Sequence, residues 1–131
     1  MPAQVGDKGH ATLTVTADRT AAAMGVRGVQ VFATPFMIGL MEDAAASVIA
    51  PHLPPGGSSV GTTVDVKHLA ATPVGMTVRA EATLLETDGR RFLFAVEAWD
   101  DKEKIGEGRH ERFAVPDLAR FLARAMKKGE G

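Results

Sequence analysis

The stretch VFATPFMIGLMEDAAASVIAPHL, residues 31–53, decides the fold. Its central part is almost entirely apolar or small, and a proline stands at each end of that part, at Pro35 and Pro51. Thr34 is a suitable N-cap and a proline suits the first helical position, whereas the second proline stops a helix. The pattern predicts a helix from Thr34 to Ala50 or Pro51 that is apolar on most of its faces.

Strand-like segments surround this helix. Apolar and polar residues alternate in most of them, which is typical of half-buried strands, and Asp88 and Gly89 form a hairpin signal. The predicted strands are HATLTVTAD (10–18) before the helix, and SVGTTVDVKHLAA (59–71), MTVRAEATLLET (76–87), RRFLFAVEAWD (90–100) and IGEGRHERFAV (105–115) after it. We expect these last four to form a meander. Pro116 begins a short predicted amphipathic helix with apolar residues at Leu118, Phe121, Leu122 and Ala125.

A helix that is apolar on most faces must be covered on most faces, and one antiparallel sheet that curls around the helix does this. We therefore predict an α+β hotdog fold, in which a curled antiparallel sheet of about five strands surrounds a long central helix and a short C-terminal helix follows. The length of 131 residues fits a single domain, residues 1–131. One flank of the central helix remains for a second subunit.

The composition argues against several classes of protein. The net charge is −1, no basic block stands out and only 5% of the residues are aromatic, so no nucleic-acid partner is expected. The chain has no cysteine and its histidines lack metal-ligand spacing, so we expect no disulfide and no metal site. The N-terminus lacks the pattern of a signal peptide, and the longest apolar stretch is too short for a membrane span. We expect a soluble, cytoplasmic protein.

Glu42 and Asp43 interrupt the apolar helix. The helix itself supplies no charged partner for Glu42, because the neighbours at three- and four-residue spacing are Ile38, Gly39, Ala45 and Ala46. A buried carboxylate without a partner is costly, so such a group normally changes its pKa or finds a partner elsewhere. Glu42 is therefore a candidate functional residue, and the alternative is a surface stripe on an otherwise apolar helix.

His68 is the second candidate. Regular alternation in the strand predicted at 59–71 places it on the same face as Val60, Thr62, Val64 and Val66. That face should turn toward the helix, where an imidazole and the carboxylate of Glu42 can share a proton and act as acid and base near neutral pH. The sequence thus predicts a Glu42–His68 pair. The alternative is a core histidine whose hydrogen bonds are satisfied.

These residues lie in segments that resemble a known family. VFATPFMIGLMEDA, GTTVDVKHLAATPVGMTV and IGEGRHER are similar to segments of the hotdog-fold thioesterases of the fluoroacetyl-CoA thioesterase type. The resemblance covers roughly residues 5–118, and the run HLAATPVG is its most specific part. It implies a catalytic set that consists of Thr34, Glu42 and His68.

The resemblance also implies how the substrate is bound. The backbone N–H of Gly61 would bind the thioester carbonyl and Arg112 would lie at the site, and Phe36 is a further candidate for substrate binding. In this family the active sites form at the interface of a homodimer, so we expect a homodimer that is able to pair into a higher oligomer. Acyl-CoA is the implied ligand, with no metal and no bound cofactor. As an alternative, Thr34 serves only as the helix N-cap.

The loop before the helix departs from the family pattern. The fluoroacetyl-specific enzyme carries aromatic lid residues there, whereas this chain has MGVRGVQ, with Gly25 and Gly28 near the positions of those phenylalanines. A glycine lid is expected to be more open and to exclude water less well. A broader or different range of short acyl groups is therefore predicted in place of fluoroacetyl specificity.

The leading hypothesis is an acyl-CoA thioesterase that hydrolyses a short acyl-CoA to the free acid and CoA. In it, Glu42 attacks the carbonyl or positions water, His68 transfers the proton, and Thr34 orients the pair or the substrate. The alternatives are a non-catalytic acyl-CoA-binding protein, an enoyl-CoA hydratase of the same fold and a structural dimer without a ligand. Tight binding of acyl-CoA without release of CoA would favour the first of these alternatives.

Overall fold

A long central helix organises the computed structural model, which describes residues 2–130. This helix, α1 (Thr34–Ile49), continues into a short 3₁₀ segment, η2 (Ala50–His52). The predicted helix is confirmed. The predicted N-cap is wrong, because Ala33 is the N-cap residue and Thr34 is the first residue inside the helix. The Thr34 hydroxyl bonds to another element instead.

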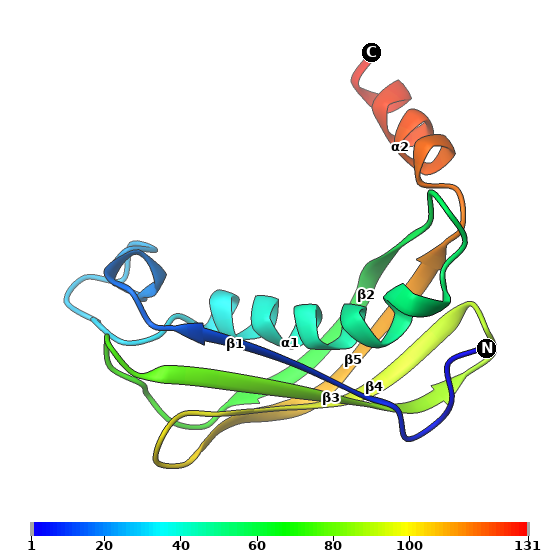
Figure 1. The fold of residues 1–131 in the computed structure, drawn as a ribbon. Helices are drawn as coiled ribbons and strands as arrows, with labels where there is room; N and C mark the ends of the chain where they lie inside the picture. Colours follow the sequence, from blue (N-terminus) through cyan, green and yellow to red (C-terminus); the bar gives the residue numbers. More distant parts are fainter. Residues whose placement is uncertain (1, 131) are drawn as a thin grey trace.

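A single antiparallel sheet curls around α1, which lies along its concave face (Figure 1). The sheet has five strands in the order β1-β3-β4-β5-β2. Their bounds are β1 (Lys8–Thr14), β2 (Ser58–His68), β3 (Thr77–Thr87), β4 (Arg91–Trp99) and β5 (Lys104–Val115). This is the predicted arrangement of one curled sheet around a central helix.

The expected meander is only partly correct. The strands β3, β4 and β5 are neighbours in sequence order, but β2 pairs with β5 and not with β3. The strand β1 pairs with β3, so β1 and β2 form the two edges of the sheet. The strand β1 also ends earlier than predicted, because the chain turns through a 3₁₀ segment, η1 (Ala17–Arg19). The edge position of β2 matters for the site, since one side of this strand pairs with no other strand of the described chain.

The core lies between α1 and the concave face of the sheet. The buried residues of α1 are Met37, Leu40, Met41, Ala44, Ala45, Val48 and Ile49. Every second residue of β3 and β4 faces them, and many of these residues are small, as at Ala80, Ala82 and Ala98. Small side chains let the helix approach the sheet closely. The approach is especially tight at Gly9 in β1, where a Cβ would lie 2.2 Å from the carbonyl oxygen of Ala44 and 2.3 Å from Oγ of Ser47.

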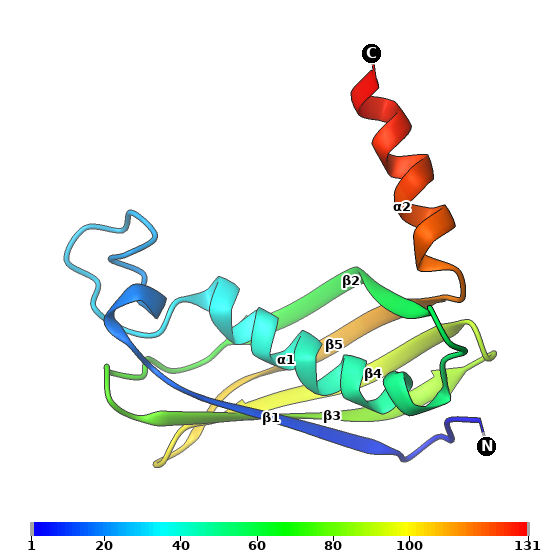
Figure 2. The same ribbon diagram turned by 45° about the horizontal axis from the view of Figure 1, so that its top comes forward.

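A second helix, α2 (Leu118–Met126), follows β5 and continues into a 3₁₀ segment, η3 (Lys127–Glu130). Asp117 is its N-cap, since the carboxylate accepts a hydrogen bond from the backbone N–H of Arg120. The helix projects away from the sheet and from α1 (Figures 1 and 2). The predicted C-terminal helix is therefore confirmed. Its apolar residues Phe121, Leu122 and Met126 are exposed, because the rest of the described chain does not cover them. None of the described helices has the length and apolar character that crossing a membrane requires.

The substitution Gly9→Ala is expected to destabilise the fold, because its new Cβ would overlap the backbone of α1. Overpacking of this kind typically lowers the free energy of unfolding by about 1–3 kcal/mol. Urea unfolding of the variant and the wild type measures the difference. Gly129→Ala is the control, since a Cβ at that position would have no other atom within 4 Å. Equal stability of Gly9→Ala and the wild type would contradict the close approach.

Candidate active site

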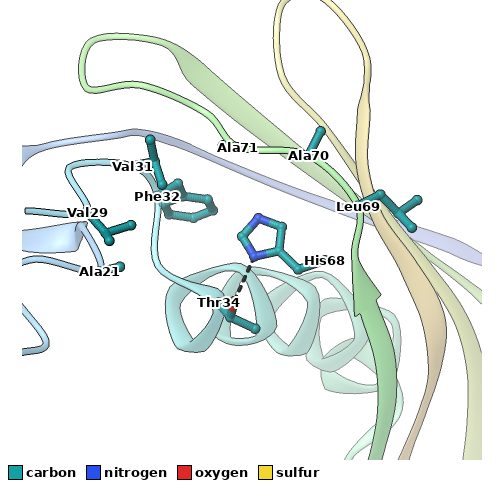
Figure 3. A pocket seen from close by; sticks show the side chains of 9 residues that line it. All are labelled: Ala21, Val29, Val31, Phe32, Thr34, His68, Leu69, Ala70 and Ala71. Carbon is teal, nitrogen blue, oxygen red and sulfur yellow. Dashed lines mark hydrogen bonds between the residues drawn. The ribbon is translucent and has the colours of Figure 1, made fainter. Parts of the chain in front are cut away.

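The first polar cluster lies at the N-terminal end of α1. Oγ1 of Thr34 lies 2.7 Å from Nδ1 of His68, so a hydrogen bond joins the first residue of α1 to the last residue of β2 (Figure 3). A pocket of about 390 Å³ lies beside this pair, and Phe32 is among the residues that line it. Nε2 of His68 is buried and has no hydrogen-bond partner among the described residues. Buried polar atoms are normally paired, so this nitrogen marks a position where a substrate or a second subunit can bind.

Burial also determines the charge of His68. It lowers the pKa of the imidazole, and the backbone of Ala70 opposes this effect. The imidazole is therefore neutral at neutral pH. A neutral imidazole is able to take up a proton from a reacting group and to release it again.

The second polar cluster lies halfway along α1, at Glu42. Nη1 of Arg112 in β5 lies 3.4 Å from Oε2 of Glu42 and forms an ion pair with it. The side chain of Arg112 is 9% exposed and that of Glu42 is 39% exposed, so the carboxylate is the accessible member of the pair. Burial lowers the pKa of Arg112 and Glu42 opposes this effect, but a guanidinium stays charged in proteins. The sheet thus supplies the partner that the helix lacks.

Gly61 of β2 lies against this ion pair. A Cβ at Gly61 would fall 2.8 Å from Oε2 of Glu42 and 3.4 Å from Nη1 of Arg112. The absence of a side chain therefore leaves room for the carboxylate beside the backbone of β2. Neither here nor elsewhere in residues 2–130 do three or more His, Asp or Glu side chains gather in a way that could hold a metal ion.

A β-bulge separates Gly61 from His68 in β2. Gly61 pairs with Arg112 while Thr63 pairs with Glu111, so the register shifts by one residue between them. In a regular strand, two residues seven positions apart point to opposite faces. The bulge cancels this difference, and both Gly61 and His68 face α1.

The bulge also corrects the predicted alternation. The prediction that Val60 and Thr62 share the face of His68 is wrong. Val60 lies before the register shift and Thr62 lies within it, so regular alternation does not connect them to His68. The Thr62 hydroxyl donates a hydrogen bond to the carboxylate of Glu111, which in turn pairs with Arg91 on the outer face of the sheet. The part of β2 after the bulge alternates as predicted.

His110 is a buried member of the second cluster that was not a predicted site residue. Nδ1 of His110 lies 2.8 Å from the carbonyl oxygen of Thr63, and Nε2 lies 3.2 Å from Nη1 of Arg112. Burial lowers the pKa of His110, and the charge of Arg112 adds to this effect. The sequence does contain a signal for it, because His110 alternates in step with Arg112 in IGEGRHER and so shares its face of the strand.

The two clusters are separate within one chain. Thr34 and Glu42 are eight residues apart, which corresponds to roughly 12 Å along the helix axis. Within the described residues, Glu42 contacts Arg112 and His68 contacts Thr34, so one chain does not form the predicted Glu42–His68 pair. Both clusters nevertheless lie along one flank of α1. On this flank the partly or fully exposed residues recur at four-residue spacing, at Thr34, Ile38, Glu42 and Ala46.

Phe36 and the glycine-containing loop lie near the first cluster. Phe36 is partly buried against the core, whereas Phe32 is the phenylalanine that lines the pocket beside His68. In the loop, Gly25 and Gly28 have φ angles of 102° and 79°, which residues other than glycine rarely adopt. An aromatic side chain at either position would therefore require a different loop conformation.

Comparison with known proteins extends these observations. The model of a family described as fluoroacetyl-CoA-specific thioesterase matches residues 15–117. The fluoroacetyl-CoA thioesterase of Streptantibioticus cattleyicolor is 48% identical over 99 residues, which make up 76% of this chain and 70% of that protein.

Solved structures show the same relationship. A structure of the fluoroacetyl-CoA thioesterase FlK has a TM-score of 0.90 and 38% identity, covering 95% of this chain and 96% of that one. A variant of that enzyme in complex with acetyl-CoA has a TM-score of 0.89 and 37% identity, with coverage of 95% and 98%. A hypothetical protein of Thermus thermophilus, described as a thioesterase superfamily member, has a TM-score of 0.84 and 32% identity, with coverage of 97% and 95%. The chain therefore belongs to the fluoroacetyl-CoA-specific thioesterase family, a group of thioester hydrolases with the hotdog fold, as its sequence predicted.

Proposed function

We propose that this protein hydrolyses a short acyl-CoA to the free acid and CoA. The observation that carries the proposal is the Thr34–His68 hydrogen bond beside a pocket, with Nε2 of His68 buried and without a hydrogen-bond partner among residues 2–130. Water adds its oxygen to the carbonyl carbon, the carbon–sulfur bond breaks, and the departing sulfur takes up a proton. A family member bound to acetyl-CoA supports this substrate class. The proposed reaction uses protein groups alone, without a metal ion or a bound cofactor.

Each cluster has a part in the proposed reaction. The neutral imidazole of His68 moves the proton to the departing sulfur, and Thr34 fixes the orientation of the ring through Nδ1. Glu42 either attacks the carbonyl carbon or positions the water molecule, and Arg112 orients its carboxylate. The backbone N–H of Gly61 stabilises the negative charge that develops on the carbonyl oxygen.

We further propose that a second copy of the chain completes the site. Thr34 and Glu42 are separated by roughly 12 Å along the helix axis, and His68 is bonded to Thr34, so Glu42 and His68 of one chain lie too far apart to act on the same carbonyl group. In a two-fold homodimer, the first cluster of one chain is able to meet the second cluster of its partner. Two features support such a dimer: the edge of β2 that pairs with no other described strand, whose residues 61–65 are exposed, and the partly exposed flank of α1.

A shared site predicts that two inactive variants restore each other. Glu42→Gln and His68→Asn are each expected to lower kcat about 100-fold or more, since each removes a group that acts on the reacting atoms. Equal amounts of the two variants, unfolded and refolded together, should regain about one quarter of the wild-type rate, because half of the dimers then carry one intact site out of two. Release of free thiol from acetyl-CoA measures the rate. If each chain carried a complete site, mixing would restore nothing.

His68 and His110 predict how stability depends on pH. The pKa values of His68 and His110 are lowered in the folded state, so the unfolded chain binds their protons more readily. The free energy of unfolding should therefore fall as the pH drops below about 6.5, the ordinary pKa of histidine. Urea unfolding between pH 8 and pH 5 measures this loss. A double variant, His68→Gln with His110→Gln, should lose most of the slope, and a stability that rises on acidification would contradict the prediction.

The loop at Gly25 and Gly28 predicts a broad acyl preference. Neither glycine carries a side chain to close the pocket, so a single fluorine or methyl group should change kcat/KM by about tenfold or less, the low end of what a shaped pocket achieves. Thiol release from acetyl-, propionyl- and fluoroacetyl-CoA measures this preference. A preference for fluoroacetyl-CoA of about 1000-fold would show that the loop excludes other groups despite its glycines. Binding of all three esters without thiol release would instead identify an acyl-CoA-binding protein.

A further inference from the structure

We infer that His110 is a positioning residue for the proposed hydrolysis. One ring nitrogen holds the bulge of β2, and the other holds the guanidinium of Arg112. The inference rests on the proposed function and goes beyond it, because His110 is not among the residues that line the pocket beside His68 and its ring bonds to Thr63 and Arg112. It acts through the groups that do the chemistry.

Two side chains of β5 clamp the bulged segment from both sides. Nδ1–H of His110 donates to the carbonyl oxygen of Thr63 at 2.8 Å. Arg112 donates from Nη2 to the carbonyl oxygen of Ser59 at 2.9 Å and from Nε to the Ser59 hydroxyl at 3.0 Å. Gly61 lies midway between Ser59 and Thr63. Because a bulge interrupts the regular ladder, these side-chain bonds fix the direction of the Gly61 backbone N–H.

The Thr63 carbonyl also selects the tautomer of His110. A carbonyl oxygen only accepts hydrogen bonds, so Nδ1 carries the hydrogen and Nε2 keeps its lone pair. Nε2 then accepts a hydrogen bond from Nη1 of Arg112 at 3.2 Å. Nη1 of Arg112 also lies 3.4 Å from Oε2 of Glu42. The ring thus sets the position of the guanidinium nitrogen that contacts the carboxylate. The His110 side chain is 1% exposed, and burial strengthens both bonds.

The clamp requires a neutral ring. A protonated His110 would turn a second N–H toward Arg112, and two positive charges would then repel each other. The charged groups that face His110 are Arg112 on its own strand and Glu42 on α1, while its partners on β2 and β4 are the apolar Val64 and Phe94. Burial lowers the pKa of His110 and so keeps the ring neutral at neutral pH. Acidification should release Arg112.

Two conservative variants separate the two bonds. His110→Asn keeps a donor near the place of Nδ1, whereas His110→Gln keeps an acceptor near the place of Nε2. If the hold on Arg112 governs the reaction, His110→Gln should lower kcat/KM by about tenfold or less and His110→Asn by about 100-fold, the scale of a misplaced catalytic group. The exposed His10, which pairs with Glu81 outside the site, provides the control His10→Gln with wild-type activity. Wild-type activity in both His110 variants would overturn the inference.

The pH dependence of kcat/KM separates a positioning role from a merely structural one, because a structural role would not change it. Glutamine does not titrate, so the ratio of kcat/KM for His110→Gln to that of the wild type should rise once the pH is low enough to protonate His110, which ring nitrogen NMR shifts report. A ratio that stays constant through that protonation would count against the inference. Thermal unfolding of each variant shows whether a loss of activity reflects a loss of folding.

Ring nitrogen NMR shifts of the wild-type protein test the geometry without any substitution. At pH 7 they should show a protonated Nδ1 and an unprotonated Nε2 for His110, and the opposite tautomer or a doubly protonated ring would overturn the inference. The two proposals fail in different ways. Absence of thioester hydrolysis in the wild type would overturn the proposed function, whereas an active wild type matched by both His110 variants would overturn the positioning role alone.

Discussion

The burial of an almost wholly apolar helix by one curled sheet is the constraint on which the rest of the structure depends. The sheet of five strands buries seven of the sixteen residues of α1 and leaves the side of the helix that faces away from it partly or fully exposed. Polar side chains on this helix are inexpensive only on that side, because elsewhere they would face the apolar core. Thr34 and Glu42 both lie there, so the polar groups of the helix necessarily gather where the fold is open.

Sequence pattern predicted the elements of this fold well because each element has a local signal. Prolines mark both ends of α1, and alternating residues mark β3 and β4. The order of the strands has no such signal. The pairing of β2 with β5 joins segments that are distant in the chain, and β3 and β5 both have alternation that suits a neighbour of β2. The predicted meander was the simplest connection, and the closure of the sheet around α1 overrides it.

The site was predicted less completely, for reasons that are visible in three residues. Threonine is a residue type that is common at the N-cap. The hydroxyl of Thr34 nevertheless bonds to His68 on β2, and no local pattern reveals this contact. Glu42 needed a partner, and alternation alone could not identify Arg112 as that partner. Thr62 carries the register shift of β2, yet a bulge changes the direction of side chains without changing the composition of the strand. The family resemblance supplied the site residues that pattern could not.

His68 and His110 show why the hydrogen bonds of each ring nitrogen, and not the pKa alone, separate the roles of residues in a site. Burial lowers the pKa of both His68 and His110, so both rings are neutral at neutral pH. Both nitrogens of His110 are paired, so moving a proton at this ring would break a bond that holds Thr63 or Arg112. One ring nitrogen of His68 bonds to Thr34, and the other is buried without a hydrogen-bond partner in the described part of the chain. The ring of His68 is therefore able to exchange a proton with a substrate while its other nitrogen keeps it in place. The ring of His110 serves instead to hold its neighbours.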